Sequence, residues 1–347
     1  MGDPESRDIG RRATLADVAA RAGVSAATAS RSLRGVPKVS DETRQRVVDA
    51  ARELSYVTAL QAAQAEGRHA VGVVVPFITR WFFSTATASA VDHLRAGGYD
   101  VLLYHLGSAD ARDHFFQQIP LAGRVDAILS LSMPLTEEHT LSLRALGLPL
   151  VSIGSAIPGS PSVGIDEVAA GRTAVNHLLN LGHTRIGFIA GQPDDFRFDF
   201  TPSTGRRRGY EQVLSAAGIE HGEELVVAGP HGVDGGASAM TELLSRPNLP
   251  TAVFAESDEL AIGALAALRR AGLRVPEDIS LIGIDGHDMA EIVDLTTVAQ
   301  DVSEQGRVAA HLLLQLLGAE AGTPDTEPVQ LPTRLVLRGS TAPPASR

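Results

Sequence analysis

Residues 14–33 read TLADVAARAGVSAATASRSL, which is the pattern of two short helices joined by a glycine turn. Thr14 is a good N-cap for the first helix, and Asp17, three residues on, can complete a capping box. Gly23 interrupts the helical period, so we expect the chain to turn there. Ser25 then caps a second helix.

The second predicted helix divides into two faces. Small polar side chains and one arginine face outward, whereas apolar side chains can pack back onto the first helix. The outward residues are Thr28, Ser30 and Arg31, and the inward residues are Val24, Ala29 and Leu33. A helix-turn-helix needs this division, because its second helix lies in the major groove of DNA. Spacing alone is equally consistent with an ordinary helical hairpin.

A third helix is predicted over residues 40–54, capped by Ser40 and apolar at helical spacing. Its apolar residues are Val47, Val48, Ala51 and Leu54. The three helices closely resemble the headpiece of the LacI/GalR (lactose-repressor) family of bacterial transcription regulators, through T-L-x-D-V-A-x-x-A-G-V-S-x-x-T-x-S-R-x-L, V-S-x-x-T-R-x-x-V and E-L-x-Y. The resemblance implies a dimer that binds a pseudo-palindromic operator on double-stranded DNA and grips or releases it in response to a small effector.

The resemblance also indicates which residues meet DNA. The predicted DNA-binding set is Thr14, Leu15, Ser25, Ala26, Ala27, Thr28, Ser30, Arg31, Arg34, Lys38, Tyr56 and Ala65, with Ser25, Arg34 and Lys38 placed on phosphate. Thr28, Ser30 and Arg31 would contact groove edges or phosphate. Ala26 and Ala27 occupy the two positions that most often read bases in the family. Their methyl groups can touch a thymine methyl but cannot make bidentate hydrogen bonds.

Charge is unevenly distributed along the chain. The whole chain carries −11 at pH 7, but residues 7–52 hold ten basic and five acidic residues. A basic headpiece on an acidic body directs the attraction for phosphate to one end. A solvated charged surface would show the same asymmetry, so charge favours DNA binding only weakly.

The composition excludes several classes of protein. With 347 residues the chain can form two or three domains, and without cysteine it has no disulfide framework, cysteine zinc site or cysteine nucleophile. Its first residues lack the apolar core of a signal peptide, and no apolar run reaches the roughly 18 residues that span a bilayer. We expect a cytoplasmic protein that does not contact a membrane, and the motifs indicate neither a cofactor nor a metal site.

Residues 58–69 are expected to form a hinge or linker. In the resembled family this segment folds into a hinge helix on DNA, with a Pro-Asn start and a leucine that wedges between base steps in the minor groove. Here Thr58 and Ala59 replace Pro and Asn, Ala63 stands where arginine is common, and Ala65 replaces the leucine. Alanine cannot unstack a base step, so we expect the operator to be bent less or bound more weakly.

From Ala70 onward, apolar strands alternate with helical stretches. The strands are AVGVVV, DVLLY, AILSL, PLVSI, RIGFIA, ELVVA, AVFA and ISLIGI, and the helices include residues 84–96, 169–181, 208–217, 236–244 and 259–271. This alternation predicts parallel sheets that helices cover on both faces. About eight strands are more than we expect in a single sheet. We therefore expect two doubly wound subdomains, the architecture of periplasmic binding proteins, which the family's sensor half shares.

The predicted domains follow this division. They are a flexible arm at 1–13, the helix-turn-helix headpiece at 14–57, the hinge at 58–69, an effector-binding and dimerisation domain at 70–340 and a tail at 341–347. Subdomain 1 covers about 70–167 and 300–330, and subdomain 2 covers about 168–299 and 331–340. By resemblance the chain returns to subdomain 1 near Gln300, and the likeness continues to residue 344 through LGHTRIGFIAG, DISLIGID, LTTV and RGSTAPP.

The effector is expected at strand ends between the two subdomains, because open α/β sheets bind ligands there. By resemblance Arg206 reaches into this cleft to grip hydroxyls or a carboxylate; alternatively it forms a structural salt bridge. Asp285 matches the family's cleft carboxylate and can accept two sugar hydroxyls; alternatively it caps the next loop through Gly286. The further candidates are Trp81, Phe82, Phe83, Asp166, His231 and Ser257.

Two departures from the family argue against a simple hexose. Ser257 stands where sugar-responsive members often carry Asn, and Gly154 stands where some carry Asp. Trp81, the single tryptophan, can stack on a ring ligand, although core packing is the commoner fate of such aromatic clusters. Phe196, Phe198 and Phe200 lie in a loop that could cover the cleft.

No enzyme signature stands in the strand-to-helix context that it requires, so we do not expect catalysis. The rival interpretations are a sugar-handling enzyme with two lobes and a two-lobed binding protein without DNA regulation. Neither interpretation explains why residues 14–54 carry the pattern of a helix-turn-helix headpiece. The sequence therefore predicts a ligand-responsive repressor that binds DNA as a homodimer and responds to a small molecule, with a sugar or sugar derivative favoured.

Overall fold

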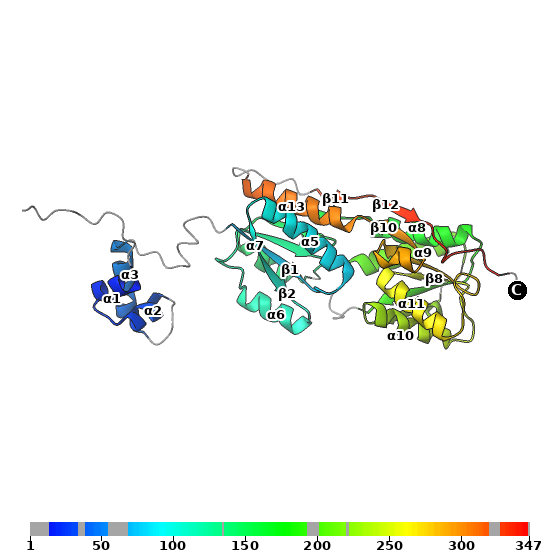
Figure 1. The fold of residues 1–347 in the computed structure, drawn as a ribbon, viewed down its shortest axis with the longest axis horizontal. Helices are drawn as coiled ribbons and strands as arrows, with labels where there is room; N and C mark the ends of the chain where they lie inside the picture. Colours follow the sequence, from blue (N-terminus) through cyan, green and yellow to red (C-terminus); the bar gives the residue numbers. More distant parts are fainter. Residues whose placement is uncertain are drawn as a thin grey trace, which may run out of the picture. The chain divides into compact units, whose positions relative to one another are not determined.

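The computed structural model describes residues 14–33, 39–54, 69–133, 135–192, 201–219, 222–318 and 327–345. The chain separates into two units, residues 1–68 and 69–347, and each unit is described by itself (Figure 1). Within the described ranges, no helix is long and apolar enough to cross a membrane.

The N-terminal unit is a bundle of three helices, α1 (Leu15–Ala22), α2 (Ala26–Leu33) and α3 (Asp41–Glu53). The predicted capping box is present: the backbone N–H of Thr14 donates to the Asp17 carboxylate over 2.7 Å, and the Asp17 N–H donates to Thr14 Oγ1 over 3.4 Å. Gly23 ends α1 with a left-handed φ of 67°, and Ser25 caps α2. The bundle core consists of Val18, Ala19, Ala29, Val47, Ala50 and Ala51.

The second unit contains two six-stranded sheets. The first sheet is parallel, in the order β11-β5-β4-β3-β1-β2, and consists of β1 (Ala70–Val75), β2 (Asp100–His105), β3 (Ala127–Leu131), β4 (Leu150–Ile153), β5 (Ser162–Gly164) and β11 (Val329–Gln330). The second sheet, in the order β12-β10-β9-β8-β6-β7, consists of β6 (Ile186–Gly191), β7 (Val226–Gly229), β8 (Ala252–Ala255), β9 (Ser280–Asp285), β10 (Thr296–Gln300) and β12 (Thr333–Val336). It is parallel except for β12, which runs antiparallel to β10.

Helices cover both faces of each sheet and so form two lobes. In the first lobe, α5 (Trp81–Ala96) and α13 (Val302–Gly318) cover one face, and α6 (Ala109–Gln118) and α7 (Glu137–Ala145) cover the other. In the second lobe, α8 (Glu167–Asn180) and α9 (Thr201–Ala216) lie opposite α10 (Val233–Leu244) and α11 (Asp258–Arg270). The short helices η1 (Glu223–Leu225) and α12 (Met289–Ile292) also belong to the second lobe. Figure 1 shows α13 beside α5, although the two are far apart in the sequence.

The predicted fold class, a three-helix headpiece followed by two doubly wound subdomains, is confirmed. The chain passes between the lobes after β5, after β10, and between β11 and β12. The strands that were not predicted are β5, β10, β11 and β12. They are short or mix polar with apolar residues, as TTVAQ does in β10, so a search for apolar runs does not find them.

Candidate functional site

A cavity lies where strand ends of the two lobes meet. The first lobe contributes Arg80, Phe82, Phe83 and Ser132 to its wall. The second lobe contributes Glu167, Pro202, Ser203, Arg206, His231, Gly232, Glu256, Ser257, Glu259 and Asp285. Several of these residues directly follow the carboxyl end of a parallel strand, which is where open α/β sheets place their ligands.

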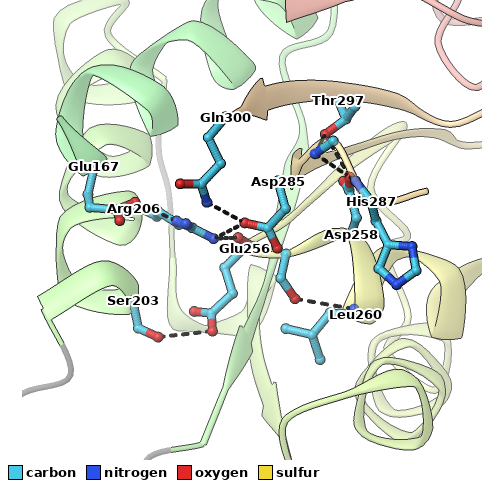
Figure 2. Close-up of polar contacts among 12 residues, drawn as sticks. Glu167, Ser203, Arg206, Glu256, Asp258, Leu260, Asp285, His287, Thr297 and Gln300 are labelled. Carbon is cyan, nitrogen blue, oxygen red and sulfur yellow. Dashed lines mark hydrogen bonds and ion pairs between the residues drawn. The ribbon is translucent and has the colours of Figure 1, made fainter. Parts of the chain in front are cut away.

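Arg206 lies at the centre of the polar wall (Figure 2). Its Nε donates to Glu167 Oε2 over 2.7 Å, and its Nη1 donates to the backbone carbonyl of Glu256 over 2.5 Å and to Asp285 Oδ1 over 3.3 Å. Burial disfavours the charged guanidinium, but the neighbouring carboxylates of Glu167 and Asp285 outweigh burial and raise the pKa of Arg206. Arg206 therefore combines the two roles considered for it, because it forms a buried salt bridge and also lines the cavity.

Two glycines allow Arg206 and Glu167 to meet. Gly171 of α8 lies against the backbone of Arg206, and Gly209 of α9 lies against the backbone of Val168. A Cβ at either glycine would overlap these backbone atoms. The close approach of α8 and α9 thus depends on both glycines.

Asp285 is held by a chain of amide groups. Its Oδ1 accepts a hydrogen bond from Gln300 Nε2 over 2.8 Å, and Gln300 Oε1 accepts one from Gln305 Nε2 over 2.7 Å. Burial raises the pKa of Asp285 to about 7, against the opposing effect of the Arg206 charge. The carboxyl group can therefore be either protonated or ionised near neutral pH.

Glu256 is the second buried carboxyl group of the cavity. Its Oε1 accepts a hydrogen bond from Ser203 Oγ over 2.9 Å, and His231 Nδ1 lies 3.8 Å from the same oxygen. Burial raises the pKa of Glu256 to about 7. The cavity thus offers buried acceptors next to the donors of Arg206, an arrangement suited to a ligand with several polar groups.

Asp258 organises the loop that follows β9. Its Oδ2 accepts hydrogen bonds from the backbone N–H groups of Gly286 and His287, each over 2.8 Å, and from Thr297 Oγ1 over 3.0 Å. Asp258, rather than Asp285, therefore caps this loop through Gly286, which corrects the alternative considered for Asp285. The carboxylate of Asp285 instead contacts Arg206.

The remaining effector candidates divide into two groups. Phe82, Phe83, His231 and Ser257 line the cavity, and Ser257 also caps α11 by accepting a hydrogen bond from the Leu260 N–H over 3.3 Å. Asp166 and Trp81 do not line it. Asp166 caps α8, because its Oδ1 accepts a hydrogen bond from the Ala169 N–H over 2.8 Å.

Trp81 connects the two lobes beside the cavity. Its indole ring stacks on the ring of His287 with centroids 5.0 Å apart, and its Nε1 donates to Asp288 Oδ2 over 3.1 Å. Its backbone N–H donates to Glu259 Oε1 over 3.4 Å. The ring expected to stack on a ligand therefore stacks on a protein side chain in this structure.

Several cavity residues were not predicted from the sequence. They include Ser132, Glu167, Ser203, Glu256 and Glu259. Glu256 directly follows the predicted strand AVFA, so including every residue that follows a predicted strand would have found it; Glu167 comes after β5, which was not predicted. Gly154 has a φ of 81°, and a Cβ there would overlap Ser132 Oγ, so in this conformation the position does not accommodate the aspartate that some members of the resembled family carry. Phe196, Phe198 and Phe200 lie outside the described residues.

In the N-terminal unit, α2 carries the predicted DNA-reading face. Ser25, Ala26, Ala27 and Arg31 are exposed, and Thr28 and Ser30 are half-buried. Thr14 is exposed at the cap of α1, and Leu15 is half-buried. Arg34, Lys38, Tyr56 and the hinge positions 58, 59, 63 and 65 lie outside the described residues. Within the described parts of both units, no three histidine or acidic side chains are grouped so as to hold a metal ion.

Two family models match the chain. The model of bacterial regulatory proteins, lacI family, matches residues 14–59, and the model of the periplasmic binding protein-like domain matches residues 175–341. The HTH-type transcriptional repressor CytR of Escherichia coli (strain K12) is 36% identical over 336 residues, which are 95% of this chain and 96% of the relative. The HTH-type transcriptional regulator CelR of Thermobifida fusca is 36% identical over 366 residues, which cover 95% of this chain and 98% of the relative.

Solved structures show the same similarity. A complex of the transcriptional regulator CelR with cellobiose has a TM-score of 0.69 and 34% identity, covering 95% of this chain and all of that chain. The lac repressor dimer bound to operator and the anti-inducer ONPF has a TM-score of 0.71 and 27% identity, covering 96% of this chain and all of that chain. A regulator from Enterococcus faecium with bound ribose has a TM-score of 0.66 and 31% identity, covering 79% of this chain and 99% of that chain.

Proposed function

This chain belongs to the lacI family of bacterial regulatory proteins and is a ligand-responsive, DNA-binding transcription repressor; we propose that its ligand is a small polyhydroxyl compound bound between the two lobes. The proposal rests on the cavity at the strand ends, where Arg206 joins two carboxylates in a buried cluster. Alternating donors and acceptors of this kind match the hydroxyl groups of a sugar. The solved relatives with cellobiose and ribose support this class of ligand.

The headpiece reads DNA with α2. Arg31 and the small side chains of Ala26 and Ala27 are exposed on this helix, and they meet the major groove, while Ser25 contacts phosphate. Because two alanines occupy the reading positions, few strong base contacts are available. Operator affinity therefore depends largely on phosphate contacts and on the spacing of the two headpieces in a homodimer.

Ligand binding changes the closure of the lobes. The first lobe directly follows the segment that connects to the headpiece, since β1 begins at Ala70. A change in closure that moves the first lobes of a dimer alters the spacing of the two headpieces. The ligand can change operator affinity only as far as its own affinity differs between the two arrangements of the lobes. The protein acts in this way in the cytoplasm and without catalysis.

The DNA-binding half of the proposal is tested with Arg31→Ala in the full-length chain. A shift assay at fixed salt, using DNA from upstream of the chain's own gene, should show operator affinity reduced by about tenfold or more. Arg46→Ala is the matched control, because Arg46 is exposed on α3 and its loss removes the same charge outside α2. Equal losses in the two variants would contradict the assignment of α2 as the reading helix.

The ligand-binding half is tested with Asp285→Asn. Calorimetry with a panel of neutral sugars, amino sugars and nucleosides should identify a ligand that changes operator binding in the shift assay. Asp285→Asn should lower affinity for that ligand while operator binding without ligand persists. If Asp285→Asn keeps full affinity for the ligand, the cavity is not the ligand-binding site.

A further inference from the structure

Acidic side chains outnumber arginines in the lining of the cavity. Its carboxylates are Glu167, Glu256, Glu259 and Asp285, and its guanidinium groups are Arg80 and Arg206. Arg206 forms ion pairs with Glu167 and Asp285, but its hydrogen bond to Glu256 goes to the backbone carbonyl. The Arg80 guanidinium lies 3.8 Å from the centre of the Phe77 ring. Arg206 therefore contacts Glu256 at its backbone carbonyl and pairs with the carboxylates of Glu167 and Asp285 instead.

The carboxylate of Glu256 is buried with one oxygen unused. The residue is 4% exposed, and its Oε2 has no hydrogen-bond partner among the described residues. The groups that face this carboxylate are Ser203 and Arg206 on α9, Glu167 on α8, His231 after β7 and the backbone N–H of Gly191 at the end of β6. His231 Nδ1 lies 3.8 Å from Oε1, which is too far for a hydrogen bond. A buried acceptor without a donor is costly, so a ligand that supplies one gains affinity there.

We propose that the effector carries a protonated amino group that donates to Oε2 of Glu256, and that it is an amino sugar or a similar amine-bearing polyol. This inference rests on the proposed function, because it places the ligand in the same cavity. An ammonium group fits the unused oxygen better than a hydroxyl, since both can donate to the carboxylate but only the ammonium also compensates its buried negative charge. Glu256 is then the residue that distinguishes an amine from a neutral sugar.

The protonation of Glu256 is consistent with this assignment. Burial raises the pKa of this carboxyl to about 7, and the backbone N–H of Gly191, the charge of Arg206 and the hydroxyl of Ser203 only partly oppose that effect. A bound cation favours the ionised form, so the ligand should bind more tightly as the pH rises from 5.5 toward 7. Over this range the amine of the ligand stays largely protonated. A neutral sugar has no comparable reason to prefer the ionised carboxylate.

The first test uses the unmodified full-length chain. Calorimetry at pH 6.5 compares matched sets in which one hydroxyl is replaced by an amine: glucose with glucosamine, galactose with galactosamine, and mannose with mannosamine, each with its N-acetyl derivative. At least one amino sugar should bind about tenfold or more tightly than its neutral and N-acetyl counterparts. Neutral sugars that bind equally well or better, or a failure of every amino sugar to bind, would overturn the proposal.

The second test uses Glu256→Gln, which keeps the shape of the side chain and removes its charge. The preferred amino sugar should lose about tenfold or more in affinity, and its advantage over the neutral sugar should disappear together with its pH dependence. Glu277→Gln, an exposed site, is the control and should retain the preference. If Glu256→Gln keeps the preference for the amine, Glu256 is not the determinant.

The two proposals fail in different ways. A neutral sugar that binds in the cavity and changes operator affinity overturns the amine assignment but leaves the repressor function in place. If no ligand of the panel changes operator affinity, the amine assignment is wrong, and the polyhydroxyl ligand class is wrong with it. Because the wild-type comparison needs no variant, it decides the question even if Glu256→Gln fails to fold.

Discussion

The two walls of the cavity differ in chemistry. The second lobe presents the buried polar groups of Arg206, Glu256 and Asp285, which are tied together by hydrogen bonds and ion pairs. The first lobe presents the rings of Phe82 and Phe83 together with Arg80 and Ser132, and no carboxyl group. Hydrogen bonds are directional whereas burial of apolar surface is not, so the second lobe recognises the ligand and the first lobe covers it.

The difference begins at the strand ends. In the second lobe, β9 ends at Asp285 and β8 is followed at once by Glu256, which places two carboxyl groups at one edge. In the first lobe, β3 is followed by Ser132, and β1 leads through a loop to the aromatic start of α5. Variants in the second-lobe wall should therefore lower both the free energy of unfolding and the affinity for the ligand. Variants in the first-lobe wall should mainly affect how the lobes close over the ligand.

The largest effect is expected from Arg206→Ala. Removing the guanidinium leaves the carboxyl groups of Glu167 and Asp285 buried without their cation, and breaking a buried pair in this way typically costs about 3–5 kcal/mol. Urea denaturation should show this loss, and calorimetry should show no ligand binding. Arg208→Ala on the same helix is the control, because Arg208 is exposed. Equal stability of the two variants would mean that the polar wall does not depend on Arg206.

The pH dependence of stability should be next in size. Burial raises the pKa of Glu256 and of Asp285 to about 7, so the folded chain holds protons that the unfolded chain releases at lower pH. The free energy of unfolding is therefore highest at pH values below the pKa values that these groups have in the unfolded chain. It falls by on the order of a few kcal/mol as the pH rises toward 7. Urea denaturation at pH 5 and at pH 7.5 measures the fall, and Glu256→Gln should reduce it. A rise over this range would contradict the burial of these groups.

A smaller effect is expected from Phe82→Ala in the first-lobe wall. Phe82 is half-buried and lines the cavity, so its loss should lower ligand affinity by about tenfold through lost apolar contact. Unfolding in urea should change much less than for Arg206→Ala. Leu141→Ala, an exposed site of the same lobe, serves as the control for losing apolar surface. Unchanged affinity in Phe82→Ala would show that the first lobe does not cover the ligand.

The smallest effect is expected where the lobes touch beside the cavity. Trp81→Phe keeps an aromatic ring against His287 but removes the hydrogen bond from Nε1 to Asp288, which contributes about 1 kcal/mol to closure. Ligand affinity should fall by about fivefold. Asp288→Ala should give a similar loss, and the double variant should lose no more than either single one. Strict additivity would mean that these two residues act independently.

Local signals in the sequence predicted the headpiece well. Thr14 and Asp17 act within the first turn of α1 and Gly23 acts on its last turn, and the structure confirms their capping and turn roles. Such hydrogen bonds depend on sequence neighbours, so no knowledge of the rest of the fold is needed to expect them. Central strands such as β1, β3 and β8 were found for a similar reason, because a strand buried on both faces has to be apolar throughout.

The cavity was predicted less completely. Arg206 and Asp285 were found through family resemblance, but Glu256 was missed and Trp81 was expected in a cavity that it does not line. Asp258 was missed as the cap of the loop after β9, because its partners Gly286 and Thr297 are distant in sequence. Contacts between distant segments depend on how the helices and strands pack, and that information is not present in local patterns.

The sequence by itself determined the class of this protein, since the motifs of residues 14–56 resemble those of a DNA-reading headpiece and the alternation of strands and helices predicts a two-lobed sensor. Tertiary structure decided which carboxylates form ion pairs with Arg206 and which carboxylate has an oxygen without a hydrogen-bond partner. The physical reason is that burial and pairing are properties of the packed chain. Glu256 carries the same carboxyl group as any exposed glutamate, and only its position between α9 and the end of β8 makes it a group that can select a ligand.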